Sequence, residues 1–281
     1  MVSEIFTATE DDLVTPIVGS WAETKYELIF NYTSLFSTGM KKIWGQRVYI
    51  DLYSGAGKAR VRNKNKITYT SPLLALKVKD PFDKYIFCDI DEKNIQSLKT
   101  RVEQEHCSAD VHYVSGDCNA NINAIIEQIP PFSKENTVLT FCFIDPYSLK
   151  LDFDTIKKLS KNRIDFLILL ALNMDGKRNI SLYLDENHDR IDKFLGLQDW
   201  RRKWDLAEKK GINLVKFLAD EFTNQMVVLG YKHEAIENFI SIRSDEKNLP
   251  LYYLAFFSKH DRGYDFWKKV RDISMEPELG L

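Results

Sequence analysis

Short apolar runs alternate with amphipathic helical patterns as far as residue 172, and this alternation is what most constrains the fold. The runs are apolar on both faces, which is typical of buried parallel strands. Parallel neighbours need a crossover connection between them, and the helical patterns supply it. The sequence therefore predicts an α/β fold with a doubly wound, mostly parallel sheet. The five strands predicted in this part are residues 47–52, 84–88, 110–114, 138–144 and 165–172.

The segments between these runs carry helix signals. Ser71 and Pro72 form an N-cap followed by a proline at the first helical position. Elsewhere the apolar residues recur every three or four positions, which is the spacing of one helix face. The helices predicted from these patterns are residues 21–36, 71–76, 92–104, 119–129 and 153–160.

After the fifth run the alternation stops. Residues 173–229 are charged and helix-rich, and we interpret them as an insertion without a strand. Residues 231–243 and 251–258 indicate two more strands, which a short link would make antiparallel neighbours. The fold class is thus a seven-stranded Rossmann-like sheet with a C-terminal antiparallel hairpin and a helical insertion. No linker or repeat divides the chain, so we predict one domain over residues 1–281, with an N-terminal arm at 1–20.

Composition narrows the class of protein. With 44% hydrophobic and 28% charged residues, a disordered or low-complexity chain is excluded. A formal charge of −2 excludes a histone-like coating protein, although local basic patches can still bind nucleic acid. We expect no signal peptide, because no charged region followed by an apolar stretch opens the sequence, and no membrane span, because the longest apolar run, 166–172, is far short of the ~20 residues that a span needs. We expect no metal site, because the four cysteines form no C-x-x-C and the five histidines no ligand-spaced pair. The expected location is cytoplasmic, and hydrolase or metalloenzyme chemistry is poorly supported.

A glycine loop follows the first predicted strand. It contains Asp51, Tyr53, Ser54, Gly55 and Gly57, and the two glycines allow a sharp turn and a close approach to a ligand. The spacing does not match the phosphate-binding loop or the dinucleotide fingerprint. The loop therefore suits a ligand that presents no phosphate, unless its role is only structural.

Acidic residues also follow the second and third predicted strands. Ligands of open α/β sheets bind at the carboxyl ends of the strands, where an acid can accept both ribose hydroxyls. We assign that role to Asp89 and a helix N-cap to Asp91. Asp117 either accepts a hydrogen bond from an adenine amine or caps the following helix, and the sequence leaves both readings open.

The fourth strand ends in Asp145, Pro146 and Tyr147. A carboxylate can accept hydrogen bonds from an amine, the proline fixes the turn, and the aromatic ring can stack on a flipped base. The plain alternative is an Asx-Pro turn that only ends the strand.

Together the four loops resemble those of class I S-adenosylmethionine-dependent methyltransferases. More narrowly, the chain resembles the three-Cys-motif partner protein family in stretches that include Thr24-Lys25-Tyr26, Ser71-Pro72-Leu73-Leu74 and Tyr252-Tyr253-Leu254-Ala255. It departs from related amine methyltransferases at Ser148, where glycine is expected, and in having one proline in the loop. The resemblance implies S-adenosylmethionine as cofactor and a Cys-motif protein as partner. The cofactor-binding residues it implies are Lys25, Asp51, Tyr53, Ser54, Gly55, Gly57, Asp89, Ile90, Asp117 and Cys118.

The predicted activity is methyl transfer to an exocyclic amine of a nucleic-acid base, with Asp145, Pro146 and Tyr147 as the catalytic loop. Five positive charges in residues 58–66, directly after the glycine loop, and further basic residues in the insertion support a nucleic-acid substrate. The plain alternative for residues 58–66 is a solvated basic loop. Trp200 and Trp204 fit either base stacking or a helix core. The alternative function is a catalytically silent methyltransferase-fold module that docks a partner through residues 173–229. The predicted substrate-binding residues are Lys58, Arg60, Arg62, Lys64, Lys177 and Arg178.

Overall fold

The structure is a computed structural model that describes residues 5–106, 108–244 and 248–275. Cys107, the first four residues of the predicted arm and three residues of the predicted link, 245–247, lie outside these ranges. The chain forms two compact units. The first comprises residues 1–143 and 261–281, and the second comprises residues 144–260.

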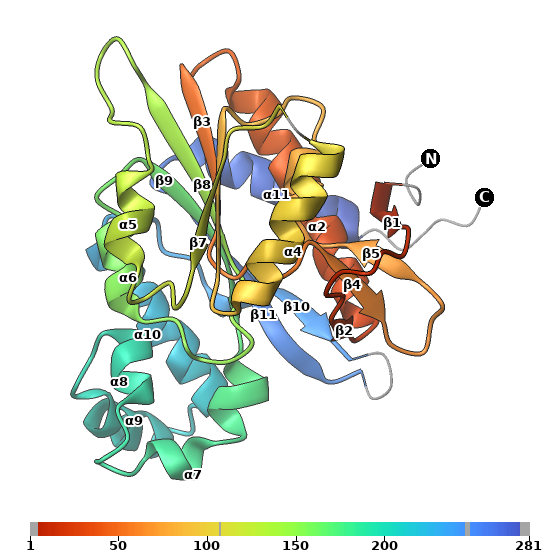
Figure 1. Cartoon of the computed structure of the whole chain (residues 1–281). Coiled ribbons are helices and arrows are strands. Elements are labelled where there is room, and N and C mark those ends of the chain that lie inside the picture. Colours follow the sequence, from red (N-terminus) through yellow and green to blue (C-terminus); the bar gives the residue numbers. More distant parts are fainter. Residues whose placement is uncertain (1–4, 107, 245–247, 276–281) are drawn as a thin grey trace. The chain divides into compact units, whose positions relative to one another are not determined.

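Four parallel strands form the centre of the first unit (Figure 1). Their order is β8-β3-β6-β7, and β3 pairs in parallel with β8 on one side and β6 on the other. Every residue of β8 is buried, which explains its uninterrupted apolar sequence. The strands are β3 (Gln46–Asp51), β6 (Lys84–Asp89), β7 (Val111–Ser115) and β8 (Val138–Ile144), whose last residue begins the second unit.

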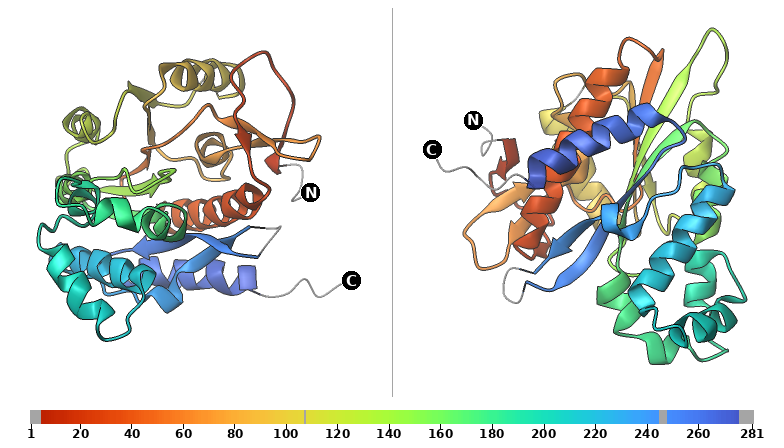
Figure 2. Two further views of the ribbon diagram at one scale, coloured as in Figure 1. Left: turned by 90° about the horizontal axis from the view of Figure 1, so that it is seen from below. Right: turned by 180° about the vertical axis from the view of Figure 1, so that it is seen from behind.

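Helices cover both faces of these strands. α2 (Trp21–Met40) and α11 (Asp261–Met275) lie side by side on one face, and α4 (Glu92–Glu105) lies on the other (Figure 2). The Tyr32 ring of α2 packs 5.1 Å from Phe141 and 5.7 Å from Trp267. Two short helices, α3 (Ser71–Leu76) and α5 (Ile122–Glu127), complete this unit among the described residues.

A small second sheet in the first unit was not predicted. It has the order β1-β5-β4-β2, and two of its strands come from the N-terminal arm. The other two form a hairpin between the glycine loop and α3, in the segment that the sequence suggested was a basic loop. The strands are β1 (Thr7–Ala8), β2 (Ile17–Val18), β4 (Lys58–Val61) and β5 (Ile67–Tyr69).

The second unit combines three strands with a group of helices. β11 (Pro250–Phe257) pairs antiparallel with both β9 (Ile164–Leu170) and β10 (Ile240–Arg243). α10 (Leu214–Val228) packs against several of the shorter helices of this unit, and Figure 1 shows the helices grouped together. The shorter helices are α6 (Phe153–Leu159), the π-helix η1 (Leu172–Lys177), α7 (Ile180–Tyr183), α8 (Arg190–Leu195), α9 (Trp200–Glu208) and the 3₁₀ helix η2 (Ile236–Asn238).

The strand order of the larger sheet is β10-β11-β9-β8-β3-β6-β7. This confirms the predicted fold class, a mostly parallel seven-stranded sheet with a C-terminal antiparallel hairpin. The sixth strand was predicted over 231–243, and its first part is wrong because only Ile240–Arg243 pairs. Tyr231 instead donates its hydroxyl to the Ile164 carbonyl, after which the chain enters η2. The single-domain reading, with its arm and insertion boundaries, stays a prediction. No described helix is long and apolar enough to cross a membrane.

Candidate active site

The glycine loop turns sharply at the end of β3. Asp51 is fully buried, and its Oδ1 accepts a hydrogen bond from the Tyr53 amide at 3.2 Å. Gly55 and Gly57 have φ angles of +63° and +87°, which side chains rarely tolerate. A Cβ on Gly57 would lie 2.8 Å from Leu98, whereas a Cβ on Gly55 would meet nothing within 4 Å. Gly57 is thus required for packing, and Gly55 faces open space.

The residue before Gly55, Ser54, carries a hydroxyl that finds no hydrogen-bond partner among the described residues. Ser54 is buried, and its Oγ has no hydrogen bond among the described residues. The backbone amide of Ser54 donates to the Cys88 carbonyl at 2.9 Å, which ties the loop to the end of β6. A buried hydroxyl without a partner is costly, and a bound molecule can supply the missing acceptor or donor.

Asp89 joins the glycine loop to β6. Its Oδ2 accepts the Gly55 amide at 2.9 Å, and its Oδ1 accepts the amides of Asp91 and of the Asn94 side chain. Asp91 Oδ1 accepts the Lys93 amide, which confirms its predicted role as N-cap of α4. Between the two acids, the Ile90 side chain is 72% exposed. An apolar side chain in that position offers a surface for a flat ring.

The loop after β7 is tied to the same edge of the sheet. The Gly116 amide donates to the Asp89 carbonyl at 2.9 Å, and Gly116 has a φ of +122°. Asp117 is exposed and accepts the Asn119 amide, but it does not cap α5, which begins at Ile122. Cys118 is buried. The capping alternative for Asp117 is therefore wrong, and its adenine role stays a prediction.

Arg101 supports the glycine loop from α4, and sequence reasoning missed it. The side chain is fully buried, and its Nη1 donates to the Ala56 carbonyl at 2.5 Å and to the Val14 carbonyl at 2.9 Å. Its Nε donates to Asp11 at 3.0 Å, and this pair holds the pKa of the Asp11 carboxyl well below its usual range. The sequence feature that could have identified Arg101 is its position three residues after Leu98, because this spacing places a cation on the apolar face of the helix.

Lys25, which the resemblance assigned to the cofactor, is a buried lysine on α2 with 4% exposure. Its ammonium lies 4.7 Å from the ring centre of Tyr26 and 5.2 Å from that of Trp21. At these distances the two aromatic faces attract the ammonium group.

The predicted catalytic loop lies in the second unit. Pro146 is buried, whereas Tyr147 is 79% exposed and presents its ring to solvent. The loop closes at Leu149, whose amide donates to Asp175 Oδ2 at 2.8 Å. Asp175 lies on the π-helix η1, an element often found at functional sites.

Asp175 is a second supporting residue that the sequence reasoning missed. It is buried, and its Oδ1 accepts hydrogen bonds of 2.6 Å from both the side-chain amide of Asn179 and the Tyr183 hydroxyl. Burial, together with the nearby Asp175 carboxylate, raises the pKa of the Tyr183 hydroxyl. Three donors thus fix the carboxylate that holds the end of the loop. The sequence feature that could have identified Asp175 is its spacing of four residues from Asn179, because side chains at that spacing are neighbours on a helix.

The basic segment after the glycine loop is largely neutralised. Lys58 is buried and pairs with Asp11 at 3.0 Å. Arg60 pairs with Glu10, and both Lys64 and Lys66 pair with Glu23. Of the predicted substrate contacts in this segment, only Arg62 is exposed without an ion pair among the described residues.

Basic residues of the second unit differ in whether they form ion pairs. Arg201 pairs with Asp192 at 3.0 Å, and Trp200 and Trp204 are buried, so the helix-core reading of both tryptophans is confirmed. Lys177 and Arg178 are exposed at the end of η1, and neither forms an ion pair with any residue in the described ranges. Within those ranges no group of three His, Cys, Asp or Glu side chains could hold a metal ion.

Comparisons with known proteins give likenesses at low identity. No family model and no curated protein matches the chain. The N-terminal domain of human METTL16 in complex with SAH is 12% identical, with 91% of this chain and 76% of that one covered and a TM-score of 0.39. A human methyltransferase 10 domain containing protein is 12% identical, with coverage of 84% and 83% and a TM-score of 0.40. A dimethyladenosine transferase from Plasmodium falciparum is 15% identical, with coverage of 83% and 62% and a TM-score of 0.38. The resemblance to the three-Cys-motif partner proteins stays a prediction.

Proposed function

We propose that this protein is an S-adenosylmethionine-dependent methyltransferase that acts on an exocyclic amine of a nucleic-acid base. The observation that carries the proposal is the hydrogen bond between Asp89 and the Gly55 amide. It joins an acid at the end of β6 to the glycine loop at the end of β3. Ligands of open α/β sheets bind at these strand ends.

The residues present fit the cofactor. Ser54 offers a buried hydroxyl without a partner among the described residues, and the space beyond Gly55 is open. In the proposal Asp51 and the glycine loop hold the methionine end, and Lys25 balances its carboxylate. Asp89 Oδ2 accepts one described hydrogen bond, and a carboxylate oxygen can accept a second from a ribose hydroxyl.

The adenine ring would lie beside Ile90. This side chain is apolar and 72% exposed, and burying it against a ring would remove apolar surface from water. Asp117 would accept a hydrogen bond from the adenine amine, and the backbone around Cys118 would contact the ring edge.

The acceptor part of the proposal rests on Asp145, Pro146 and Tyr147. Tyr147 is exposed enough to stack on a base that has left its helix. Asp145 would accept a hydrogen bond from the amine and so direct the nitrogen lone pair, while Pro146 fixes the turn. The cofactor supplies an electrophilic methyl group, and the chain mainly aligns the acceptor with it.

The charges favour particular contacts with the nucleic acid. Lys177 and Arg178 are exposed and lack ion pairs among the described residues, so both can reach phosphates. The paired cations Lys58, Arg60 and Lys64 would first have to leave their acidic partners. We therefore assign the main phosphate contacts to the π-helix segment, and weaker ones to the hairpin.

Calorimetry with S-adenosylmethionine tests the cofactor site. Asp89→Ala removes the acid that holds Gly55 and is expected to weaken binding at least tenfold, about 1.4 kcal/mol. Asp91→Ala is the matched control, because it removes only the helix cap next to the site and should leave affinity within about twofold. Absence of binding by the wild-type protein would overturn the proposal.

A further inference from the structure

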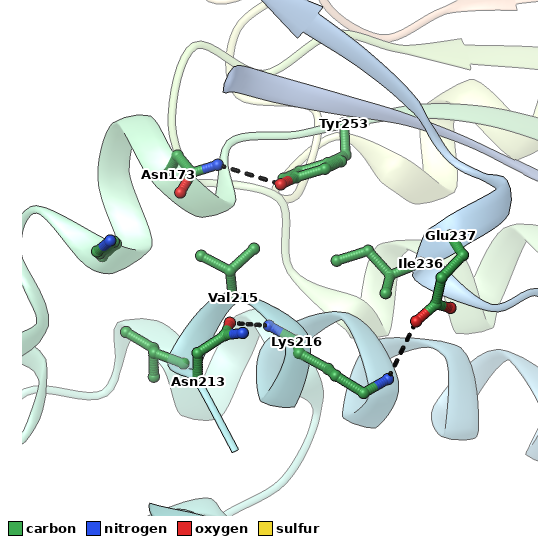
Figure 3. Close-up of a pocket in the computed structure, with 9 residues that line it drawn as sticks. Asn173, Asn213, Val215, Lys216, Ile236, Glu237 and Tyr253 are labelled. Atoms are coloured by element: carbon green, nitrogen blue, oxygen red, sulfur yellow. Dashed lines mark hydrogen bonds and ion pairs between the residues drawn. The ribbon is translucent and has the colours of Figure 1, made fainter. Parts of the chain in front are cut away.

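A cavity of about 470 Å³ lies within the second unit (Figure 3). Its walls come from four elements: η1, the start of α10, η2 and β11. Pockets for small ligands commonly start near 300 Å³, so this cavity is large enough for one nucleotide. Its lining residues are Asn173, Lys177, Asn213, Leu214, Val215, Lys216, Ile236, Glu237 and Tyr253.

One wall presents polar groups of a kind that read base edges. The Asn173 side-chain amide lies 3.5 Å from the Tyr253 hydroxyl, and both face the cavity (Figure 3). At that length the hydrogen bond is weak, so a ligand can replace it at little cost. An asparagine side chain offers one acceptor and two donors, the pattern that pairs with two adjacent atoms of a base.

Apolar side chains also line the cavity. Leu214 and Val215 are buried at the start of α10, and Ile236 of η2 is a further lining residue. Figure 3 shows Val215 and Ile236 across the cavity from the Asn173–Tyr253 pair. A flat heterocycle between these walls would place its face on aliphatic groups and its edge near the amide.

The charged residues that line the cavity favour a ligand with an anionic group. Lys216 lies 3.6 Å from Glu237 and 3.3 Å from Asp220, so its charge is balanced locally. Lys177 is exposed, and no acidic partner for it appears among the described residues. The unbalanced charge of the lining is therefore a lysine ammonium, which suits a phosphate.

From these features we infer that the cavity binds a single nucleotide, with its base against Asn173 and its phosphate against Lys177. This inference rests on the proposed function, because it makes the bound nucleotide a neighbour of the methylated one in the same strand. Base recognition outside the reacting position would give the enzyme sequence preference.

The π-helix connects this cavity with the proposed catalytic loop. Asn173 and Lys177 of η1 line the cavity, and Asp175 between them bonds to the Leu149 amide. A shift of η1 on nucleotide binding would therefore be passed to the end of that loop through one carboxylate.

Calorimetric titration of the full chain with the four nucleoside 5′-monophosphates tests the inference, with the matching nucleosides and inorganic phosphate as further probes. At least one monophosphate should bind tenfold or more tightly than its nucleoside and than phosphate. Lys177→Ala should remove the advantage over the nucleoside, and Asn173→Ala should weaken both. Lys193→Ala, an exposed lysine of α8 paired with Asp189, is the matched control and should change nothing.

Three results would overturn the inference: no monophosphate binding up to about 10 mM, inorganic phosphate binding as tightly as the nucleotides, or unchanged nucleotide affinity in Lys177→Ala. Melting curves show whether each variant is folded. S-adenosylmethionine binding is measured in the same preparations. Nucleotide binding without cofactor binding would refute the proposed function while leaving the cavity's ligand class standing.

Discussion

The glycine loop of the first unit and the Asp145 loop of the second unit are each held by one buried charged side chain, but with opposite signs. Arg101 donates to the Ala56 carbonyl of the glycine loop, and Asp175 accepts the Leu149 amide at the end of the other loop. Arg101 also binds Asp11 and Val14 of the N-terminal arm, whereas the other described donors to the Asp175 carboxylate, Asn179 and Tyr183, lie four and eight residues after it in the chain.

We call Arg101 and Asp175 the anchors of their loops, and they differ in the segments that they connect. Arg101 connects α4 to two segments that are distant in the sequence, the glycine loop and the N-terminal arm, so its loss should reduce the stability of the whole unit. Asp175 connects the Leu149 amide to the nearby Asn179 and Tyr183, so its loss should disturb one local region and change function more than stability. Substitutions at these two residues and at other charged groups should therefore separate a loss of stability from a loss of function.

Replacing Arg101 should be the most destabilising change. In Arg101→Met the Asp11 carboxylate loses the guanidinium and keeps the Lys58 ammonium, while the Val14 and Ala56 carbonyls lose a buried donor. We expect a loss of about 3 kcal/mol in the free energy of unfolding near pH 7. Because Asp11 has a lowered pKa when folded, its contribution is present above its unfolded pKa and is lost as the pH falls through the folded value. The difference between wild type and variant should therefore shrink below about pH 4.

Urea denaturation measures this effect. Arg60→Met is the matched control, because Arg60 forms an exposed pair with Glu10 and should cost less than about 1 kcal/mol. Equal losses in the two variants would contradict the role of Arg101 as an anchor.

The second unit should respond to pH in the opposite sense. Burial raises the pKa of Asp165 in β9 to about 7, with the Ser258 hydroxyl as a hydrogen-bond partner. A carboxyl whose pKa is raised in the folded protein costs no stability below its unfolded pKa. It destabilises the folded protein increasingly as the pH rises from the unfolded pKa to the folded pKa. Asp165→Asn should therefore stabilise the protein by about 2–4 kcal/mol at pH 8 and by far less at pH 4.

Thermal melts across this pH range provide the test. A stabilisation by Asp165→Asn that does not change with pH would show that the carboxyl does not titrate in the folded protein.

Loss of Asp175 should affect catalysis more than cofactor binding. Asp175→Ala leaves the Leu149 amide without its acceptor, and misplacement of the loop should slow methyl transfer about 10- to 100-fold. Asp175→Asn should restore part of the rate, because its amide oxygen can still accept from Leu149. A steady-state assay together with calorimetry separates the two effects, and a parallel loss of S-adenosylmethionine affinity would count against the role.

The smallest effects concern the two basic segments. A cation without an acidic partner contributes more to phosphate binding than one that must leave a carboxylate. Lys177→Ala should reduce the salt dependence of RNA binding by about one ion, and Lys64→Ala, which removes a lysine paired with Glu23, by less. Filter binding at several salt concentrations compares them, and a larger change in Lys64→Ala would reverse the assignment.

The sequence predicted those features that depend on local pattern. Buried strands such as Val138–Ile144 have continuous apolar runs, and Asp91 caps α4 because a capping acid acts on its immediate neighbours. It did not predict the β4–β5 hairpin, whose pairing with the arm depends on residues about 50 positions apart.

Ion pairs between residues that are far apart in the sequence were not predicted either. The charge count in residues 58–66 suggested an open basic patch, but the acids that neutralise it, Glu10, Asp11 and Glu23, come from the N-terminal segment. For the same reason Arg101 and Asp175 were not recognised as anchors: their partners are defined only when the chain folds.

Transfer of a labelled methyl group from S-adenosylmethionine to total cellular RNA and DNA measures the proposed activity itself. The wild-type protein should label one of the two acceptors. Asp145→Ala should lower the rate by at least about 100-fold while S-adenosylmethionine affinity stays within about twofold. A wild-type protein that binds the cofactor but labels neither acceptor would contradict the account, and would favour a binding module with a methyltransferase fold.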